Sequence, residues 1–352
     1  MNTNATIKDV ARLAGVSTAT VSLVVNQKEG VKPETRERVL AAVRQMNYTP
    51  NASARQLIDR KSHTIGLVVT DVMNPFFGAI VSAIHQCVQA RGYQLSIGLS
   101  NDSVVAERSC VKRFQEERVE GIIVIPSVQR DSSLDYYSSL NTPFVFMTTY
   151  YEQIPADCVM CNLYEGSYLM TKYFLEHGRK KIYFIGGEPE AVFTKLRPRG
   201  YIDAHRQCGA KFSSSWIYNI FPDSDYADRR TNYAKMNISS HFSGGFSVVG
   251  RMLDDMPDAI ETINDEVAMG ILSGLKARGV RVPEDVSVMG VDGLPLSSFL
   301  VPRLATVRQT VSLLAKRSVE ILLGNIERNA PACHETVPFE ILSRESIREI
   351  SH

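Results

Sequence analysis

The hydrophobic and polar positions of this 352-residue chain follow two different patterns. Up to about residue 46, apolar residues recur three or four positions apart, as they do on short amphipathic helices. From His63 onward, short apolar runs alternate with amphipathic stretches that are long enough for a helix. Alternation of this kind predicts parallel sheets covered by helices on both faces. We therefore expect an α/β protein with a small helical head and a larger body.

The body contains more strands than one sheet holds comfortably. Its apolar runs predict strands at 65–69, 93–99, 121–126, 143–147, 181–186, 216–221, 258–263, 286–291 and 335–343. Its amphipathic stretches predict helices at 76–91, 104–118, 165–177, 266–278 and 310–326. Because the segment 162–165 falls near the midpoint, we expect two doubly wound parallel-sheet lobes with a cleft between them. The polar stretch 222–243 interrupts the alternation and predicts an exposed loop or an extra helix.

The stretch 6–31 predicts a helix-turn-helix. Thr6 followed by Asp9 is a capping pattern that starts a first helix, and Gly15 can adopt the left-handed backbone of a sharp turn. Ser17 then offers an N-cap oxygen to a second helix over 18–25, and Pro33 opens a third helix. Two short helices joined by such a turn form the DNA-reading motif, although an ordinary helical hairpin has the same spacing.

The second helix carries small hydrogen-bonding side chains, which favour the DNA-binding interpretation. Such side chains can reach base edges or phosphate oxygens. They are Thr18, Thr20, Ser22 and Asn26. The segment 51–59, which includes Ala54 and Arg55, has too few apolar residues to form a stable helix alone. It is either a flexible tether or a segment that folds only against DNA or a partner.

Charge is distributed unevenly between head and body. The chain has a formal net charge of +1, yet its first 62 residues hold ten Lys and Arg against five Asp and Glu. The remainder holds 29 against 33. A basic head on a mildly acidic body indicates nucleic acid as the partner of the head alone, unless these charges form only a solvated face.

Several classes of protein are disfavoured. The first residues lack the features of a secretory signal, and no apolar run approaches the ~18 residues that span a membrane, so we expect a cytoplasmic protein without membrane contact. Six irregularly spaced cysteines indicate reduced thiols, and for Cys158 and Cys161 buried packing is favoured over a redox or metal role. The sequence carries no dinucleotide, P-loop or nucleophile-elbow motif. We therefore expect neither an enzyme nor a cofactor or metal.

Side chains that follow the predicted strands indicate a ligand site in the cleft, because open α/β sheets bind ligands at the carboxyl ends of their strands. Phe76 and Phe77 follow the first strand, and Arg197 opens a helix. Asn264 and Asp292 follow two later strands. Together they suit a small polar ligand such as a sugar or nucleobase. Taken singly, each could instead cap a helix or form a surface ion pair.

The residues also resemble a known family. Ala14-Gly15-Val16-Ser17 followed by Thr20-Val21-Ser22 is similar to the helix-turn-helix of the LacI/GalR repressors. The resemblance continues through Asn74-Pro75-Phe76-Phe77, Glu120-Gly121-Ile122-Ile123, Glu165-Gly166, Arg197 with Gly200-Tyr201, Asn264-Asp265, and the segments 282–292 and 304–309. It implies a periplasmic-binding-protein-like core that senses a small effector, and a dimer that binds a palindromic operator.

The resemblance also implies roles for single residues. Thr18, Ala19 and Leu23 occupy base-reading positions. Leu57 occupies the position of a hinge leucine that wedges into the minor groove, where an apolar side chain unstacks a base step. The residues expected at the DNA are Thr6, Ser17, Thr18, Ala19, Thr20, Ser22, Leu23, Asn26, Asn51, Ala54, Arg55 and Leu57. Those expected at the effector are Phe76, Phe77, Thr148, Arg197, Phe221, Asn264 and Asp292.

The sequence departs from the family pattern at several positions. Leu23 stands where a longer polar residue is common, so we expect one apolar base contact, to a thymine methyl. Thr148-Thr149 replaces a frequent Asp-Arg, and Cys161 replaces a frequent Asp, which argues against a simple sugar ligand. The insertion between Phe221 and Gly244 could reshape the cleft mouth. A leucine-heptad tail is missing after the last strand, so we expect a dimer rather than a tethered tetramer.

These observations give an expected organisation. A helix-turn-helix DNA-binding domain spans 1–49, a hinge helix and linker 50–62, and an effector-binding and dimerisation core 63–352. Within the core, the N-subdomain spans about 63–161 and 293–325, and the C-subdomain about 162–292 and 326–345. The expected function is a dimeric repressor controlled by a sugar-like effector between the lobes. The alternatives are an effector-independent activator or architectural DNA-binding protein with a vestigial cleft and, less favoured, an enzyme fused to a DNA-binding head.

Overall fold

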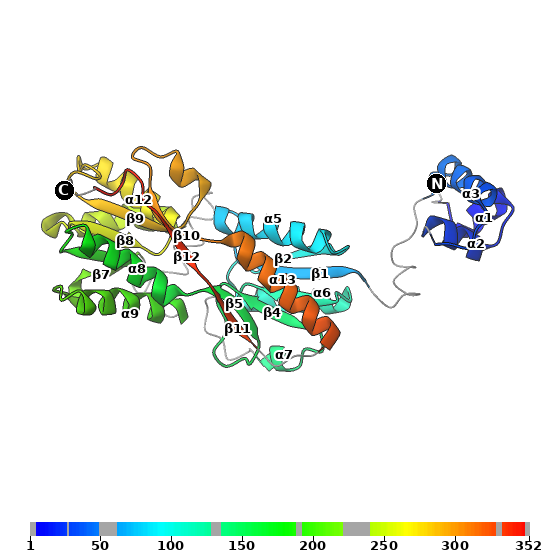
Figure 1. The fold of residues 1–352 in the computed structure, drawn as a ribbon, viewed down its shortest axis with the longest axis horizontal. Helices are drawn as coiled ribbons and strands as arrows, with labels where there is room; N and C mark the ends of the chain where they lie inside the picture. Colours follow the sequence, from blue (N-terminus) through cyan, green and yellow to red (C-terminus); the bar gives the residue numbers. More distant parts are fainter. Residues whose placement is uncertain are drawn as a thin grey trace. The chain divides into compact units, whose positions relative to one another are not determined.

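The chain forms two units, Met1–Ser62 and His63–His352, in a computed structural model (Figure 1). The structure describes residues 5–26, 28–48, 62–127, 135–187, 192–220, 240–328 and 333–348. In the described residues, none of the helices is long and apolar enough to cross a membrane.

The first unit is a three-helix head consisting of α1 (Ile7–Ala14), α2 (Thr18–Val25) and α3 (Pro33–Gln45). Its helices enclose a small core around Val10, Val21 and Val39. The expected capping box starts α1, because Thr6 and Asp9 each accept a hydrogen bond from the other's backbone amide. Gly15 adopts a φ of 63° in the turn that follows. The helix-turn-helix prediction is therefore confirmed.

The described part of the body contains two sheets, as predicted, with six strands in each. The single strand expected at 335–343 is instead two short strands in different sheets. The order in the first lobe is β11 (His334–Val337), β5 (Asp157–Cys161), β4 (Phe144–Met147), β3 (Gly121–Val124), β1 (Thr64–Val69) and β2 (Gln94–Leu99). The order in the second lobe is β12 (Phe339–Leu342), β10 (Ala305–Gln309), β9 (Ser287–Asp292), β8 (Ala259–Thr262), β6 (Ile182–Gly186) and β7 (Ile217–Asn219). All pairings are parallel except that of β10 with β12.

Helices cover the faces of both sheets. In the first lobe they are α5 (Pro75–Gln89), α6 (Val104–Glu116), α7 (Asp135–Ser138) and α13 (Val311–Arg328), and α5 and α13 lie side by side (Figure 1). In the second lobe they are α8 (Leu163–Glu176), α9 (Val192–Gln207), α11 (Ser240–Val248) and α12 (Asp265–Lys276). Helices α8 and α9 pack together, as do α11 and α12.

The division of the chain between the lobes differs from the expected one at two strands. Strand β10 was expected in the N-subdomain (293–325), but it pairs with β9 and β12 of the second sheet. Strand β11 was expected in the C-subdomain (326–345), but it pairs with β5 of the first sheet. Strand pairing joins segments that are distant in the chain, so a local pattern of residues does not show which sheet each strand enters.

Among the described residues, the chain passes between the lobes at three places. These are the steps from β5 to α8, from β10 to α13 and from β11 to β12, the last of which is visible as the red segment in Figure 1. Phe339, just after the third crossing, packs against hydrophobic clusters of both lobes. A Cβ at Gly166 would lie 2.6 Å from the Phe339 ring. The junction is thus tightly packed around one aromatic side chain.

Candidate DNA-reading helix and effector cleft

The second helix of the head presents polar residues away from its buried side. Val21 and Val24 are buried in the core, whereas Thr18 and Ala19 are exposed and Leu23 is half-buried. The exposed N-terminal turn of α2 can therefore meet a partner without disturbing the core. This is the part of a recognition helix that contacts base edges in helix-turn-helix proteins.

The other expected DNA-contacting residues of the head lie in local hydrogen bonds. Thr6 belongs to the capping box of α1, and Ser17 caps α2 by accepting from the amide of Thr20 at 3.1 Å. The Nδ2 of Asn26 lies 3.3 Å from the hydroxyl of Ser22. Asn51, Ala54, Arg55 and Leu57 lie outside the described residues.

Two arginines that the sequence analysis did not select brace the segments flanking α2. Arg38 donates to the carbonyl of Ala14 at 3.1 Å, and Arg36 donates to the carbonyl of Lys28 at 2.7 Å. Both come from α3, so the third helix holds the chain just before the turn that precedes α2 and just after the end of α2. Their separation in sequence from the segments they hold explains why the local pattern did not reveal them.

Asp292, at the end of β9, lies in a strained and buried turn. Its φ is 117°, an uncommon conformation for a residue with a side chain. Burial raises the pKa of Asp292 well above its usual range, and the nearby charge of Asp265 adds to the effect. The turn is held because Asp265 accepts from the amide of Leu294 at 2.8 Å and from the hydroxyl of Thr306 at 2.6 Å. Asp265, noted in the sequence beside Asn264 as part of the family motif, is thus a structural support of this turn.

A pocket of about 350 Å³ beside Asp292 is lined by residues of both lobes. From the first lobe, Phe76 at the start of α5 lines it, and from the second lobe Asp292 and Gln309 do. Phe77 packs edge-on against Phe76 at a ring distance of 5.5 Å. An aromatic face opposite acceptor oxygens is an arrangement that binds small polar ring compounds. Gln309 was not selected from the sequence, although it ends a strand in the same way as Asp292.

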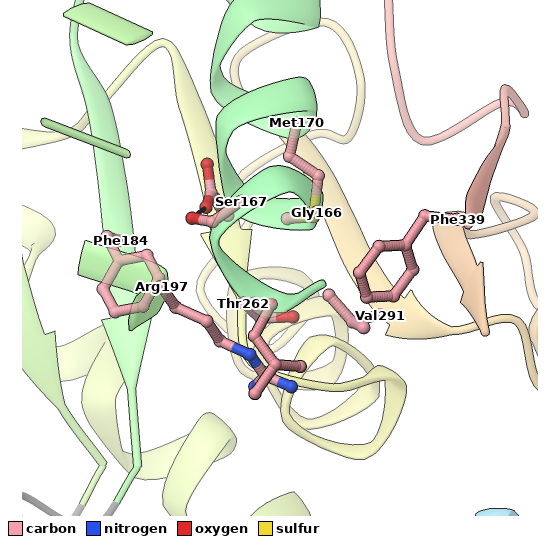
Figure 2. A pocket seen from close by; sticks show the side chains of 10 residues that line it. Gly166, Ser167, Met170, Phe184, Arg197, Thr262, Val291 and Phe339 are labelled. Carbon is pink, nitrogen blue, oxygen red and sulfur yellow. Dashed lines mark hydrogen bonds between the residues drawn. The ribbon is translucent and has the colours of Figure 1, made fainter. Parts of the chain in front are cut away.

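Arg197 is a half-buried residue of α9 in the second lobe. Its Nη1 donates to the carbonyl of Ile263 at 2.8 Å, and its guanidinium extends toward Thr262 (Figure 2). The side chain borders a cavity of about 10 Å³, large enough for about one water molecule, which Phe339 and Glu261 also line.

Cys161 lies close to both of these charged groups. The pKa of Cys161 is raised to about 12, mainly by burial; the charge of Asp292 also raises it, whereas that of Arg197 lowers it. Because the thiol stays protonated at neutral pH, it serves as a packing group rather than a reactive one.

The remaining expected effector residues are less clearly placed in the cleft. Asn264 caps α12 by accepting from the amide of Val267 at 2.9 Å, and its Nδ2 lies 3.3 Å from Nδ1 of His241. Thr148 follows β4 and has a φ of 68°, and neither of the two pockets above includes it. Phe221 and most of the 222–243 stretch lie outside the described residues.

A buried carboxylate in the first lobe was missed by the sequence analysis. Glu107 of α6 is fully buried and accepts hydrogen bonds from three tyrosine hydroxyls and from the amide of Ser127 at 2.7 Å. The tyrosines are Tyr136, Tyr137 and Tyr151, at distances between 2.7 and 3.1 Å. Ser127 follows β3 and Tyr151 follows β4. Glu107 therefore ties together the loops on the carboxyl edge of the first sheet.

Comparison with known proteins relates both units to DNA-binding regulators. The model of bacterial regulatory proteins of the lacI family matches residues 6–51, and the periplasmic binding protein-like domain matches residues 171–347. The HTH-type transcriptional repressor PurR of Pasteurella multocida is 33% identical over 349 residues, covering 98% of this chain and 99% of that protein. The protein of the same name from Mannheimia succiniciproducens is 32% identical, covering 99% and 100%.

A solved structure is similar over almost the whole length of the chain. The lac repressor dimer bound to operator and the anti-inducer ONPF has a TM-score of 0.83 and 26% identity, covering 98% of this chain and 99% of that one. The names of these three similar proteins describe transcriptional repressors, and none describes an enzyme.

Proposed function

Because the chain belongs to the LacI family of DNA-binding transcriptional repressors, we propose that it binds a palindromic operator as a homodimer under the control of a small effector between its lobes. The observation that carries this proposal is the pocket that joins Phe76 of the first lobe to Asp292 and Gln309 of the second. A ligand that contacts both sides would favour one relative position of the lobes.

The effector is a small polar ring compound in this proposal, sugar-like or a nucleobase. Phe76 supplies an apolar ring face, and Asp292 and Gln309 supply polar groups at the ends of adjacent strands. Such a site orients a ring by stacking and by a few directed hydrogen bonds. A thermal-shift screen of sugars, sugar phosphates and nucleobases tests it, because a ligand of the folded state raises the melting temperature. A screen without any shift would favour the effector-independent DNA-binding protein instead.

Base reading falls to the exposed turn of α2 and to the hinge. Thr18, Ala19 and Leu23 are the proposed base-reading residues, and Leu57 is the proposed minor-groove wedge. A gel-shift assay on DNA upstream of the protein's own locus tests the wedge. Leu57→Ala should lose operator affinity far more than non-specific affinity, because bending the operator depends on the wedge whereas backbone contacts do not. Equal losses would contradict it.

The proposed dimer uses exposed apolar residues of the second lobe. Leu296, Phe299 and Val301 are 52%, 79% and 90% exposed within one loop after β9. Large exposed apolar groups this close together are uncommon on a monomer surface and mark contact sites. Since a lac repressor of similar structure is a dimer, a second copy of this chain is the proposed occupant.

A further inference from the structure

An acidic side chain lies in the interior of the second lobe, on a central strand. Glu261 of β8 is 1% exposed. Strand register places Phe184 of β6 and Met289 of β9 beside it, and neither of these paired residues carries a charge. A carboxylate in such a position is costly unless it is paired or protonated. Neither the proposed operator contacts nor the proposed effector contacts account for it.

The number of hydroxyl hydrogens available to the acceptors around Glu261 indicates whether its carboxyl group is protonated. The Ser167 hydroxyl donates to Oε1, and the hydroxyl oxygen of Thr171 lies 2.6 Å from Oε2. The same Thr171 oxygen lies 2.9 Å from the carbonyl oxygen of Ser167. A hydroxyl has one hydrogen, and the carbonyl can only accept. If Thr171 donates to the carbonyl, the short contact with Oε2 requires a hydrogen on the glutamic acid.

A protonated Glu261 satisfies every group in this cluster. Its Oε2 donates to Thr171, Thr171 donates to the Ser167 carbonyl, and the Ser167 hydroxyl donates back to Oε1. An ionised side chain would instead take both hydroxyl hydrogens and remain a buried anion. Burial raises the pKa of Glu261 to about 8, which agrees with the hydrogen count.

Arg197 is the cation that acts on this acid. It lines the same 10 Å³ cavity as Glu261 and Ser167, and its charge lowers the pKa of Glu261. The other titratable group facing the acid from α9 is Tyr201, whose hydroxyl donates to the carbonyl of Ile182 at 2.6 Å and so keeps its proton. From α8 the facing groups are the uncharged hydroxyls of Ser167 and Thr171. The positive charge of Arg197 therefore lowers the proton affinity of Glu261, and offsetting that charge should raise it.

We propose that Glu261 is a proton-binding residue in the cavity that Arg197 lines, and that its proton is linked to the charge of Arg197. The consequence for ligands rests on the proposed effector site. A ligand that brings an anionic group to Arg197 offsets the cation, so Oε2 takes up a proton from solvent as the ligand binds. A neutral ligand leaves the proton where it is. Above neutral pH, Glu261 thereby makes the affinity for a ligand depend on whether the ligand is anionic or neutral.

Infrared difference spectroscopy of the full-length chain, titrated with pH in the absence of any ligand, tests the proton site. The wild type should show the carbonyl band of a protonated carboxylic acid that disappears through about pH 8, and E261Q should lack it. Arg197→Met should raise the midpoint by about half a pH unit or more, because a cation near the acid is lost. Arg199→Met, an exposed arginine on the same helix, is the matched control and should leave the midpoint unchanged.

Two further variants keep the test decisive. Arg197→Lys retains the charge and should leave the midpoint close to that of the wild type. Thr171→Val removes a hydroxyl that bonds to either form of the acid, but more strongly to the ionised one, so it should raise the midpoint without changing Arg197. A wild-type spectrum identical to that of E261Q, or a midpoint that neither Arg197→Met nor Thr171→Val moves, would overturn the proposal. Because no effector is used, failure of the effector proposal would leave this band in place.

Discussion

The Nε2 of Gln309 donates a hydrogen bond of 2.7 Å to Oδ1 of Asp292 and joins the ends of two adjacent parallel strands, β10 and β9. Gln309 is also the last residue of β10 before the chain crosses to α13 in the first lobe. The acidic group of the pocket is therefore held by the segment that connects the lobes. A ligand that changes the position of Asp292 acts directly on that connection.

The cluster around Glu107 should be essential to the stability of the first lobe. Glu107→Ala leaves three tyrosine hydroxyls and the amide of Ser127 without their acceptor. Buried donors without partners are costly, so we expect a loss of about 3 kcal/mol or more in the free energy of unfolding, measured by urea denaturation. Glu116→Ala, an exposed position on the same helix, is the control and should change it by less than about 0.5 kcal/mol.

Gly200 allows the close crossing of α8 and α9. A Cβ at this position would lie 2.1 Å from the backbone carbonyl oxygen of Tyr164, which has no side-chain freedom to move away. Gly200→Ala should therefore separate the helices and lower the melting temperature, at a cost of about 3 kcal/mol. Gly324→Ala on α13 meets nothing within 4 Å and should instead stabilise the protein by about 0.5–1 kcal/mol. Equal effects of the two substitutions would rule out the close-contact explanation.

His205 should make the second lobe sensitive to acid. The side chain is fully buried, its Nδ1 donates to the carbonyl of Tyr201 at 3.0 Å, and Nε2 is one of the buried polar atoms without a partner in the described part of the chain. Burial lowers the pKa of His205 below its ordinary 6.5. Since folding disfavours the protonated ring, its contribution to stability is complete above that ordinary value and is lost as the pH falls through the folded-state value.

Urea denaturation at several pH values checks the role of His205. His205→Gln should flatten the decline of the unfolding free energy between about pH 7 and 5, because the variant has no group to protonate there. His85→Gln, at an exposed site on α5, serves as the comparison and should retain the wild-type decline. If both variants retain it, another group is responsible.

The loop that contains Phe299 should control the oligomeric state. Phe299→Asp places a charge at a residue that is 79% exposed in the single chain and buried in the proposed dimer. We expect the dissociation constant from sedimentation equilibrium to rise by at least about tenfold, because buried aromatic residues dominate such contacts. Leu253→Asp, at an exposed apolar residue elsewhere in the second lobe, is the control and should leave the dissociation constant unchanged. A monomeric wild type would contradict the dimer proposal.

Local signals in the sequence were sufficient for the head and for most of the body. Capping at Thr6, the turn at Gly15 and the apolar periodicity each act within a few residues, so the pattern contains them. Strands β5 and β10 were not predicted as strands, because the apolar run of β5 after Asp157 is only four residues long and Arg308 interrupts the run of β10. Their assignment depends on neighbouring strands that supply the hydrogen bonds, and these are distant in the chain.

The candidate site was predictable only in part, for the same reason. Phe76 and Asp292 were selected because they follow strands, and the structure brings both to one pocket. Glu107 and Glu261 were not selected, because the groups that satisfy them come from residues between 20 and 94 positions away. A sequence shows an isolated acidic residue in such a case, and only the fold shows what surrounds it.

The central claim is that a ligand bound at Asp292 controls DNA binding, and one measurement tests it most directly. DNA fragments are selected with the wild type, and the affinity for them is then measured in gel shifts with and without cell extract, for the wild type and for Asp292→Ala. The extract should change the affinity of the wild type by about fivefold or more, a typical allosteric coupling. Asp292→Ala should bind the same fragments but give no response. The same response in both proteins, or none in the wild type, would contradict the claim.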